Sequence, residues 1–425
     1  MPLRAINSGL SPALPTAPPA SGGVTARLTE EAALIPLRSE RLRLDMLCEE
    51  GALLAQGAPV ARMRDHPEVA LVAPMAARLA RVRLGPGRQL IELLFFHEPE
   101  AGRHVFEVAA ARHGDAAAIR VLMQQAGLWR LLRSRPFGRM PAVAESPAAI
   151  FVMAADTRPH APDPVAMLEG RGESFSRGLA ALGRLTGGPV FLCQPRGPAL
   201  AGPGAVEGRL RILRCGNRHP QGLAGFRIHH EHPATPEAPV WELHAEDVAD
   251  LGALLETGSL PGLRSVSVTG EALTETRLLR CQPGANLRGL CQGAVVPGWH
   301  QVLSGSALDG HEATWLGLRD RQVTVQDSHR GSPRSHWFSN ALRRAARPLP
   351  VIPTAALEQA FGTALPAMAL IRALSSGDDE SFTRLGGLSL LEEDLALADY
   401  VTGATPRLSA LLRAALDRIA AEEGL

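Results

Sequence analysis

The sequence predicts an α+β protein built from several domains. A chain of 425 residues that is 45% apolar has room for more than one hydrophobic core. Short apolar runs with alternating polarity fill the first quarter of the chain, helices alternate with short apolar runs in the middle, and helical periodicity dominates the end. This succession predicts a β-rich domain, an α/β domain with a mostly parallel sheet, a second β-rich domain and a helical domain.

The N-terminal part begins with a leader over residues 1–25, which is rich in proline and small residues. This composition predicts an extended or partly disordered segment with little chemistry of its own. Residues 26–108 follow as the first β-rich domain. Its predicted strands lie within Arg41–Leu47, Val69–Val72, Leu79–Leu84 and Leu90–Phe96.

The α/β domain is predicted over residues 109–262. Its strands are expected at Ala148–Ala154, Val190–Cys193, Gly208–Cys215 and Phe226–His229, and its last helix at Ala245–Thr257. The first of these strands is apolar throughout and ends in a polar loop that contains Asp156 and Thr157. In open parallel sheets ligands bind beyond the carboxyl ends of the strands, so we expect a ligand site at this loop.

The second β-rich domain is predicted over residues 263–345. Arg264–Gly270 and Arg277–Cys281 are its expected strands, and a helix is expected to start within Gly284–Leu290. Residues 346–425 complete the chain as the helical domain, with LLEEDLALADY and LSALLRAALDRIAAEEG as its most periodic segments.

Charge and composition exclude several classes of function. The chain has no lysine, which rules out a Walker lysine and a Schiff-base lysine, and its formal net charge of +1 gives no field that would attract nucleic acid. No apolar run is long enough for a transmembrane helix or a signal peptide, which predicts a cytoplasmic protein. The five cysteines form no CxxC, so neither a zinc ribbon nor an iron–sulfur cluster is expected.

An arginine-rich segment is the first candidate site. Arg130, Arg133, Arg135 and Arg139 surround Pro136 in what reads as a loop. Guanidinium groups offer planar donors that suit an anionic cofactor or the polar head group of a quinone. The alternative is a loop that faces solvent or a partner protein.

Histidines and acids mark weaker candidates. The segment HPQGLAG at His219–Gly225 has the small residues of a close-approach turn but lacks GxGxxG. On a strand His230 and His232 would share a face, although a third metal ligand at suitable spacing is missing. Glu392–Asp394 lie where a helix start favours acids. No GxSxG motif supports hydrolase chemistry.

Three blocks carry a resemblance to a known family. GLWRLLRSRPFGRMPAVAESPAAIFVMAADTRPHAPDP, HPQGLAGFRIHHEHPA and LSSGDDESFTRLGGLSLLEEDLALADYV resemble, in this order, segments of the A subunit of the sodium-translocating NADH:quinone reductase. That family is itself similar to RnfC and to the flavin-binding subunit of respiratory complex I. The resemblance implies a barrel-sandwich (lipoyl-like) domain, a Rossmann-like domain, a β-grasp (ubiquitin-like) domain and a helical domain, in the order of the four segments above.

The resemblance also implies what the chain lacks. Where the relatives hold FMN with a glycine-rich loop, Gly127–Pro141 carries Trp129, Leu131, Leu132 and arginines instead. The cluster cysteines of the relatives are absent as well. The resemblance therefore implies a subunit with no FMN and no iron–sulfur cluster of its own, peripheral on the inner face of the bacterial plasma membrane and bound to membrane subunits.

Ubiquinone is the ligand that the resemblance suggests, and the isolated chain is expected to be non-catalytic. The expected quinone-binding residues are Arg133, Arg135, Phe137, Met140, His219 and His229. An apolar wall with a few hydrogen-bond donors is what a quinone pocket requires. The alternative is a non-catalytic scaffold in another membrane redox complex.

Overall fold

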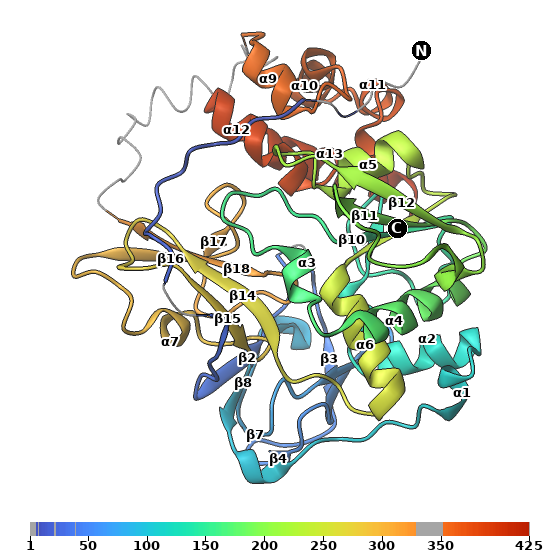
Figure 1. The fold of residues 1–425 in the computed structure, drawn as a ribbon, viewed down its shortest axis with the longest axis vertical. Coiled ribbons are helices and arrows are strands. Elements are labelled where there is room, and N and C mark those ends of the chain that lie inside the picture. The colour runs from blue at the N-terminus through green and yellow to red at the C-terminus, as the bar shows by residue number, and fades with distance from the viewer. Residues whose placement is uncertain (1–5, 7, 21–22, 39, 329–351, 425) are drawn as a thin grey trace.

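The computed structural model of the chain describes residues 6, 8–20, 23–38, 40–328 and 352–424. This part of the chain is a mixed α/β structure with four β-sheets and a helical C-terminal region (Figure 1). Each sheet keeps two edge strands, so none of the four described sheets is a closed barrel. The predicted boundary between residues 345 and 346 lies outside the described residues.

Two small antiparallel sheets form the first β-rich region. One has the order β2 (Glu31–Leu34), β8 (Leu90–His97), β7 (Ala77–Leu84) and β4 (Leu53–Leu54), and the other has β3 (Leu44–Met46), β5 (Pro59–Met63) and β6 (Ala70–Val72). Along β8, Leu93 and Phe95 are fully buried while the neighbouring Phe96 is 42% exposed. This alternation buries one face of the sheet and leaves the other to solvent, as the sequence pattern predicts.

The five-stranded sheet confirms the predicted mostly parallel sheet. Its order is β12 (Leu210–Cys215), β11 (Val190–Pro195), β10 (Ala149–Met153), β13 (Val240–His244) and β9 (Arg133–Arg135), and all neighbours except the β13–β9 pair are parallel. The chain builds β10, β11 and β12 outward on one side and then returns to place β13 on the other side of β10. The strand order therefore reverses between β10 and β13.

Helices cover this sheet and explain why its strands are apolar on both faces. The helices of the region are α1 (Ala109–Arg112), α2 (Ala116–Gln125), α3 (Pro164–Met167), α4 (Gly172–Arg184), α5 (Ala224–Glu231) and α6 (Ala245–Thr257). Every residue of β10 is buried. A strand covered on both sides reads as a continuous apolar run, and this is why Ala148–Ala154 could be predicted as a buried strand.

Two local predictions in this region were wrong. The segment Phe226–His229, expected as a strand, belongs to helix α5. Its side chains enter two different cores, Phe226 on the side of the C-terminal helices and Ile228 on the side of the sheet. With eight residues, α5 is too short for its periodicity to distinguish a helix from a strand. His230 and His232 consequently do not share a strand face.

The arginine-rich segment is also not a simple loop. It contains a short 3-10 helix, η3 (Trp129–Leu131), followed by β9, which pairs antiparallel with β13 at the sheet edge. Arg130 and Arg135 are buried, which excludes a freely solvated loop as their setting.

A six-stranded sheet follows. Its order is β1 (Thr25–Ala26), β15 (Arg277–Cys281), β14 (Arg264–Thr269), β18 (Gln322–Asp327), β16 (His300–Ser304) and β17 (His311–Glu312), with helix α7 (Leu287–Cys291) packed nearby. The described residues of the N-terminal leader are extended and lie against the α/β region and the region of the six-stranded sheet. The backbone of Leu10 bridges to His219, and that of Pro19 bridges to Thr276.

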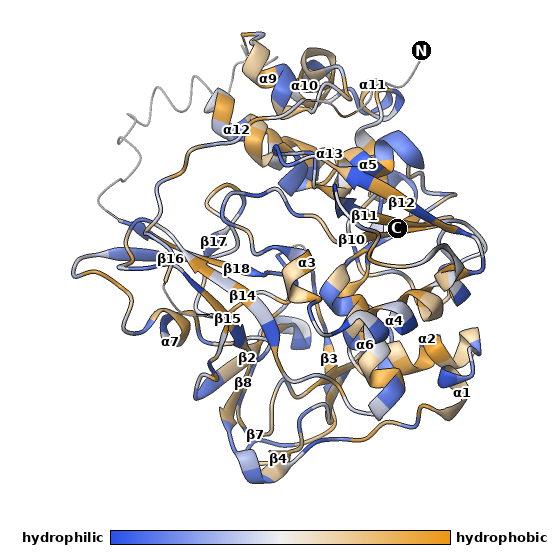
Figure 2. Cartoon of the chain, in the orientation of Figure 1, coloured by the Kyte–Doolittle hydropathy of each residue, from blue (hydrophilic) through white to orange (hydrophobic). Residues whose placement is uncertain are grey.

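The C-terminal region is helical, as predicted. It contains α9 (Ala355–Ala360), α10 (Ala367–Ser376), α11 (Asp379–Arg384), η5 (Gly387–Ser389), η6 (Glu392–Leu395), α12 (Ala396–Thr402) and α13 (Leu408–Glu422). Figure 2 shows hydrophobic residues along these helices. Their core also includes Ile6, Phe137 and Phe226 from other regions, so this helical unit is packed firmly onto the rest of the chain.

Candidate functional site

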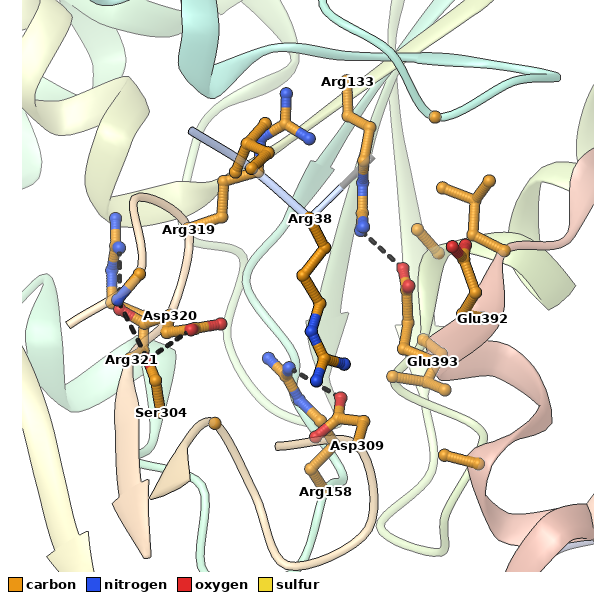
Figure 3. Close-up of a pocket in the computed structure, with 18 of the residues that line it drawn as sticks. Arg38, Arg133, Arg158, Ser304, Asp309, Arg319, Asp320, Arg321, Glu392 and Glu393 are labelled. Carbon is orange, nitrogen blue, oxygen red and sulfur yellow. Dashed lines mark hydrogen bonds and ion pairs between the residues drawn. The ribbon is translucent and has the colours of Figure 1, made fainter. Parts of the chain in front are cut away.

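A cavity of about 590 Å³, which we call the central cavity, lies where four parts of the chain meet. It is lined by the stretch 35–38 ahead of β3, by the ends of β10 and β13, by the segment 304–321 of the six-stranded sheet region and by residues 391–413 of the helical region. Figure 3 shows side chains from these segments turned toward one another across the cavity.

The parallel sheet places this cavity at its topological switch point. Asp156 follows β10 and His244 ends β13, and both line the cavity. Because the strand order reverses between β10 and β13, the loops that leave these two strands diverge and open a crevice at their carboxyl ends. The sequence-based expectation of a ligand site after Ala148–Ala154 therefore coincides with a cavity.

A cluster of five charged side chains lies at one wall of the cavity, which Arg133, Glu242 and Glu393 line. Arg135, which is fully buried, contacts Glu242 at 2.9 Å and Asp394 at 2.7 Å. Arg133 contacts Glu393 at 2.6 Å and also pairs with Glu242. The cluster joins β9 and β13 of the sheet to η6 of the helical region, and all of its members except Glu242 are candidates that the sequence singles out.

The charges of this cluster shift one another's pKa values. Burial favours the neutral carboxyl and raises the pKa of Asp394 to about 6, against the opposing effect of Arg135. Burial also acts to raise the pKa of Glu393, but Arg133 and Arg135 outweigh it and lower that pKa to about 2. The cluster therefore holds an ionised Glu393 beside a carboxyl of Asp394 that gains a proton in mildly acidic solution.

Most of the other arginines at the cavity have partners. Arg158 contacts Asp156 at 2.6 Å and Asp309 at 3.3 Å. Arg319 donates to the backbone oxygens of Arg130 and Leu132, at 2.9 and 2.6 Å. Burial and the nearby charge of Arg133 lower the pKa of Arg319 to about 9.

Arg38 differs from these arginines. Its side chain projects into the middle of the cavity, toward Arg158 and Asp309 (Figure 3). Within the described part of the chain its guanidinium makes no hydrogen bond or ion pair, and the residue is exposed. Arg38 is therefore a cavity donor that is free to meet a ligand.

A second hollow of about 960 Å³, the side cleft, adjoins the central cavity at residues 155–158. It is lined by loops that follow β10, β11 and β12 and by the leader residues 10–12. His219 lies in its wall, 1% exposed. Burial lowers the pKa of His219 to about 4, so the ring is neutral at neutral pH.

The hydrogen bonds of His219 leave one ring nitrogen open. Its Nδ1 lies 3.3 Å from the Thr157 hydroxyl oxygen, which accepts the N–H of Gly222 at 3.0 Å. Its Nε2 has no hydrogen-bond partner among the described residues. If the Thr157 hydroxyl donates to Nδ1, the proton of the neutral ring sits on Nε2 and can be offered to an acceptor.

The six residues expected to bind quinone occupy different places. Arg133 lines the central cavity and His219 lines the side cleft. Arg135, Phe137, Met140 and His229 line neither of these two hollows. Arg135 is buried in the charge cluster, Phe137 packs into the helical core and His229 packs against Gly386.

Sequence reasoning missed six arginines at the central cavity: Arg38, Arg158, Arg319, Arg321, Arg407 and Arg413. Arg158 follows the predicted strand end closely and could have been suspected from that position. Arg38 and Arg319 lie in segments without a recognisable motif, and only the packing of four regions brings them together.

The described part of the chain contains neither a metal-binding group nor a membrane-spanning helix. Within the described ranges, no group of three or more histidine, cysteine or acidic side chains is placed to hold a metal ion. No helix in the same ranges combines the length and the apolar character that crossing a membrane requires.

Comparisons with known proteins agree with the sequence blocks. Residues 114–260 match a family model described as the NqrA second alpha/beta domain, and residues 265–314 match the NQRA C-terminal domain. A solved structure of the NAD+-reducing [NiFe]-hydrogenase in the H2-reduced state covers 72% of this chain and 64% of its own, with 14% identity and a TM-score of 0.40. That likeness is too low to carry an argument.

Curated relatives match along nearly the whole chain. The A subunit of the Na(+)-translocating NADH-quinone reductase of Alcanivorax borkumensis is 30% identical, over 89% of this chain and 90% of the relative. The corresponding proteins of Pasteurella multocida and Neisseria gonorrhoeae are 30% and 31% identical, each over 92% of this chain and 94% of the relative. The chain therefore belongs to the NqrA family, the A subunits of the Na(+)-translocating NADH-quinone reductase.

Proposed function

We propose that this chain is a peripheral, cytoplasmic-side subunit of a membrane-bound, sodium-translocating NADH:ubiquinone reductase in the bacterial plasma membrane. Membership of the family supports the complex, and the names of the relatives supply the sodium, the NADH and the quinone. In this proposal the membrane subunits of the reductase are its partners, the chain works on the quinone side, and it has no catalytic activity in isolation.

The same proposal assigns a domain type to three regions of the chain. Residues 26–108 would be the barrel-sandwich (lipoyl-like) domain, residues 109–262 the Rossmann-like domain and residues 263–345 the β-grasp domain. The mostly parallel sheet with helices on both faces supports the second of these names.

The central cavity is the proposed site for the quinone ring. Its volume of about 590 Å³ falls in the range of small-molecule pockets. Its lining combines seven leucines with seven arginines and eight acidic residues. The leucines offer apolar surface to a quinone ring, and the arginines offer hydrogen-bond donors to its carbonyl oxygens. The leucines are Leu37, Leu131, Leu223, Leu243, Leu308, Leu318 and Leu391.

The free guanidinium of Arg38 is the single observation that carries this proposal. Arg158 and Arg319 donate to carboxylates or backbone oxygens, whereas Arg38 points into the cavity without a partner among the described residues. A donor of this kind can bind a quinone carbonyl oxygen. Arg133, at the same cavity, would be the second donor.

The other expected residues would act less directly. The Nε2 of His219 could donate from the side cleft to a ligand that extends past residues 155–158. Arg135 would hold Glu242 and Glu393 in place beside Arg133. Phe137, Met140 and His229 would support the shape of the site from behind it.

A flavin of its own is not part of the proposal. Trp129 and Leu132 are fully buried in the stretch where the resemblance places the flavin loop, and the indole N–H of Trp129 donates to the Pro141 oxygen at 3.0 Å. Side chains therefore fill that stretch, which supports a chain without FMN.

The test is a titration of the purified full chain with ubiquinone-1, followed by tryptophan fluorescence and calorimetry. Arg38→Gln should weaken binding about tenfold or more, because a hydrogen bond from a charged donor is lost. Arg139→Gln is the matched control, since Arg139 is exposed and lines neither hollow. Equal affinity of the Arg38→Gln variant and the unchanged protein would contradict the proposal.

A non-catalytic scaffold is the second candidate, favoured by the buried charge cluster that joins the sheet to the helical region. A scaffold would bind no ligand but would still join its complex. If the chain binds none of ubiquinone-1, FMN and NADH and the reductase still assembles normally, the scaffold role is supported over the quinone-binding role.

A further inference from the structure

A small apolar chamber of about 80 Å³ lies next to the central cavity. Its walls come from three regions: β6 and the residues after it, the end of α2 and the segment 260–264. Ala73 and Ala126, both buried, face this chamber from the first two of these regions. Leucine, valine and proline side chains make up most of the remaining wall.

The chamber adjoins the central cavity. Leu131 and Leu318 line both spaces, so these two residues lie between them. The backbone oxygen of Leu318 accepts a hydrogen bond from Arg264 at 2.5 Å, which fixes the main chain at this point. An apolar group on a ligand in the central cavity would reach the chamber by passing these two leucines.

Most polar side chains at the chamber already have partners. Gln56 donates to the Leu260 oxygen at 3.1 Å, Arg130 pairs with Glu40 at 2.6 Å, and Asp250 pairs with Arg171 at 2.5 Å. The Nε of Arg264 is the exception, buried without a partner within the described residues. The chamber thus offers mainly apolar surface, and an apolar occupant fits it better than a polar one.

We propose that the chamber receives the first apolar unit of the quinone side chain while the ring lies in the central cavity. This inference rests on the proposed function and assigns the part of the site that binds the side chain of the quinone, its tail. An apolar cavity of roughly 150 Å³ can hold benzene, so a space of about 80 Å³ suits a group of four or five carbon atoms. One branched five-carbon unit next to the ring meets this requirement.

The experiment compares ubiquinone-0, which has no tail, with ubiquinone-1, which has one five-carbon unit, on the purified full chain. The unchanged protein should bind ubiquinone-1 about tenfold or more tightly than ubiquinone-0, because the tail leaves water. Ala73→Leu fills the chamber and should make the affinities for ubiquinone-1 and ubiquinone-0 equal, without lowering the affinity for ubiquinone-0. The control Ala144→Leu makes the same change at an exposed position and should keep the difference.

A second variant tests the same assignment in case Ala73→Leu does not fold. Leu260→Ala enlarges the chamber and should raise the affinity for ubiquinone-2, with two units, relative to ubiquinone-1. Thermal unfolding of each variant shows whether it is folded. If ubiquinone-0 binds but the tail adds nothing, or if Ala73→Leu keeps the full tail effect, the chamber assignment is overturned while the proposed function stands. If neither ubiquinone-0 nor ubiquinone-1 binds, both the chamber assignment and the proposed function fall.

Discussion

The charge cluster at the wall of the central cavity holds more acid than base. Among the described residues, Glu242, Glu393 and Asp394 form ion pairs only with Arg133 and Arg135, so full ionisation would leave one negative charge in excess within the cluster. Such an excess favours the uptake of a proton, and the raised pKa of Asp394 identifies the carboxyl that takes it.

Asp394 and His219 should give opposite pH dependences of stability. The pKa of Asp394 is about 6 in the folded chain and near 4 in the unfolded chain, so the folded chain keeps this proton and loses stability as pH rises from about 4 to 6. The pKa of His219 is about 4 in the folded chain and near 6.5 in the unfolded chain, so its contribution to stability grows as pH rises over the same window.

The measurement is the free energy of unfolding in urea at several pH values from 4 to 7. Asp394→Asn should make stability rise more steeply with pH than in the unchanged protein, and His219→Gln should make it rise less steeply or fall. Each change in slope should amount to about 2 to 3 kcal/mol over the window. Curves that stay parallel to that of the unchanged protein would show that neither group titrates as stated.

At the scale of elements, two glycines determine how closely α4 and α6 pack. A Cβ atom on Gly178 of α4 would lie 1.9 Å from the Val248 oxygen, and one on Gly252 of α6 would lie 1.7 Å from the Ser174 oxygen. Neither distance is possible between real atoms, so these glycines let the two helix backbones touch. This close contact keeps α6 against the sheet whose strand ends line the central cavity.

Gly178→Ala should force these helices apart and lower the free energy of unfolding by about 1 to 3 kcal/mol, because overpacking shifts the backbone. Gly172→Ala is the matched control in the same helix, since nothing lies within 4 Å of its added Cβ. That variant should be neutral or more stable by up to about 1 kcal/mol, through better helix propensity. Urea denaturation of both variants measures the difference, and equal stabilities would refute this account of the packing.

At the scale of the whole molecule, a few buried polar residues join the regions. Glu246 at the start of α6 accepts hydrogen bonds from the backbone and hydroxyl of Ser265, both at 2.9 Å, and from Arg321 at 3.1 Å. It is 1% exposed. This carboxylate ties the α/β region to the six-stranded sheet, and the segment carrying Arg321 lines the central cavity.

Glu246→Ala should uncouple these two regions and leave Arg321 with only Asp247 as its acidic partner among the described residues. Removing one partner of a buried charge pair costs about 3 to 5 kcal/mol. In calorimetry the variant should unfold in separated steps, or in one transition at a clearly lower temperature. Glu256→Ala changes an exposed acid on the same helix and should leave the transition where it is. Identical transitions for the two variants would contradict a joining role for Glu246.

Strand and helix positions were predictable where local pattern and burial agree. Buried parallel strands such as β10 and β11 read as apolar runs, and α6 was predicted at its observed bounds because acids begin it and Gly258 ends it. The helix α5 was missed because it has only eight residues, and the periodicity of so short a segment does not distinguish a helix from a strand. The edge strand β9 was missed because its pairing with β13 depends on contacts far along the chain.

The sequence by itself determined the family, the order of its regions and the strand end at which a cavity lies, since blocks of residues and apolar runs are local properties. Only the tertiary structure decided which arginines face the cavity. Arg135 is paired with buried carboxylates, while Arg38, in a segment without a motif, stays free among the described residues. Whether a charged side chain is paired depends on partners that are distant in sequence, and folding alone brings them within reach.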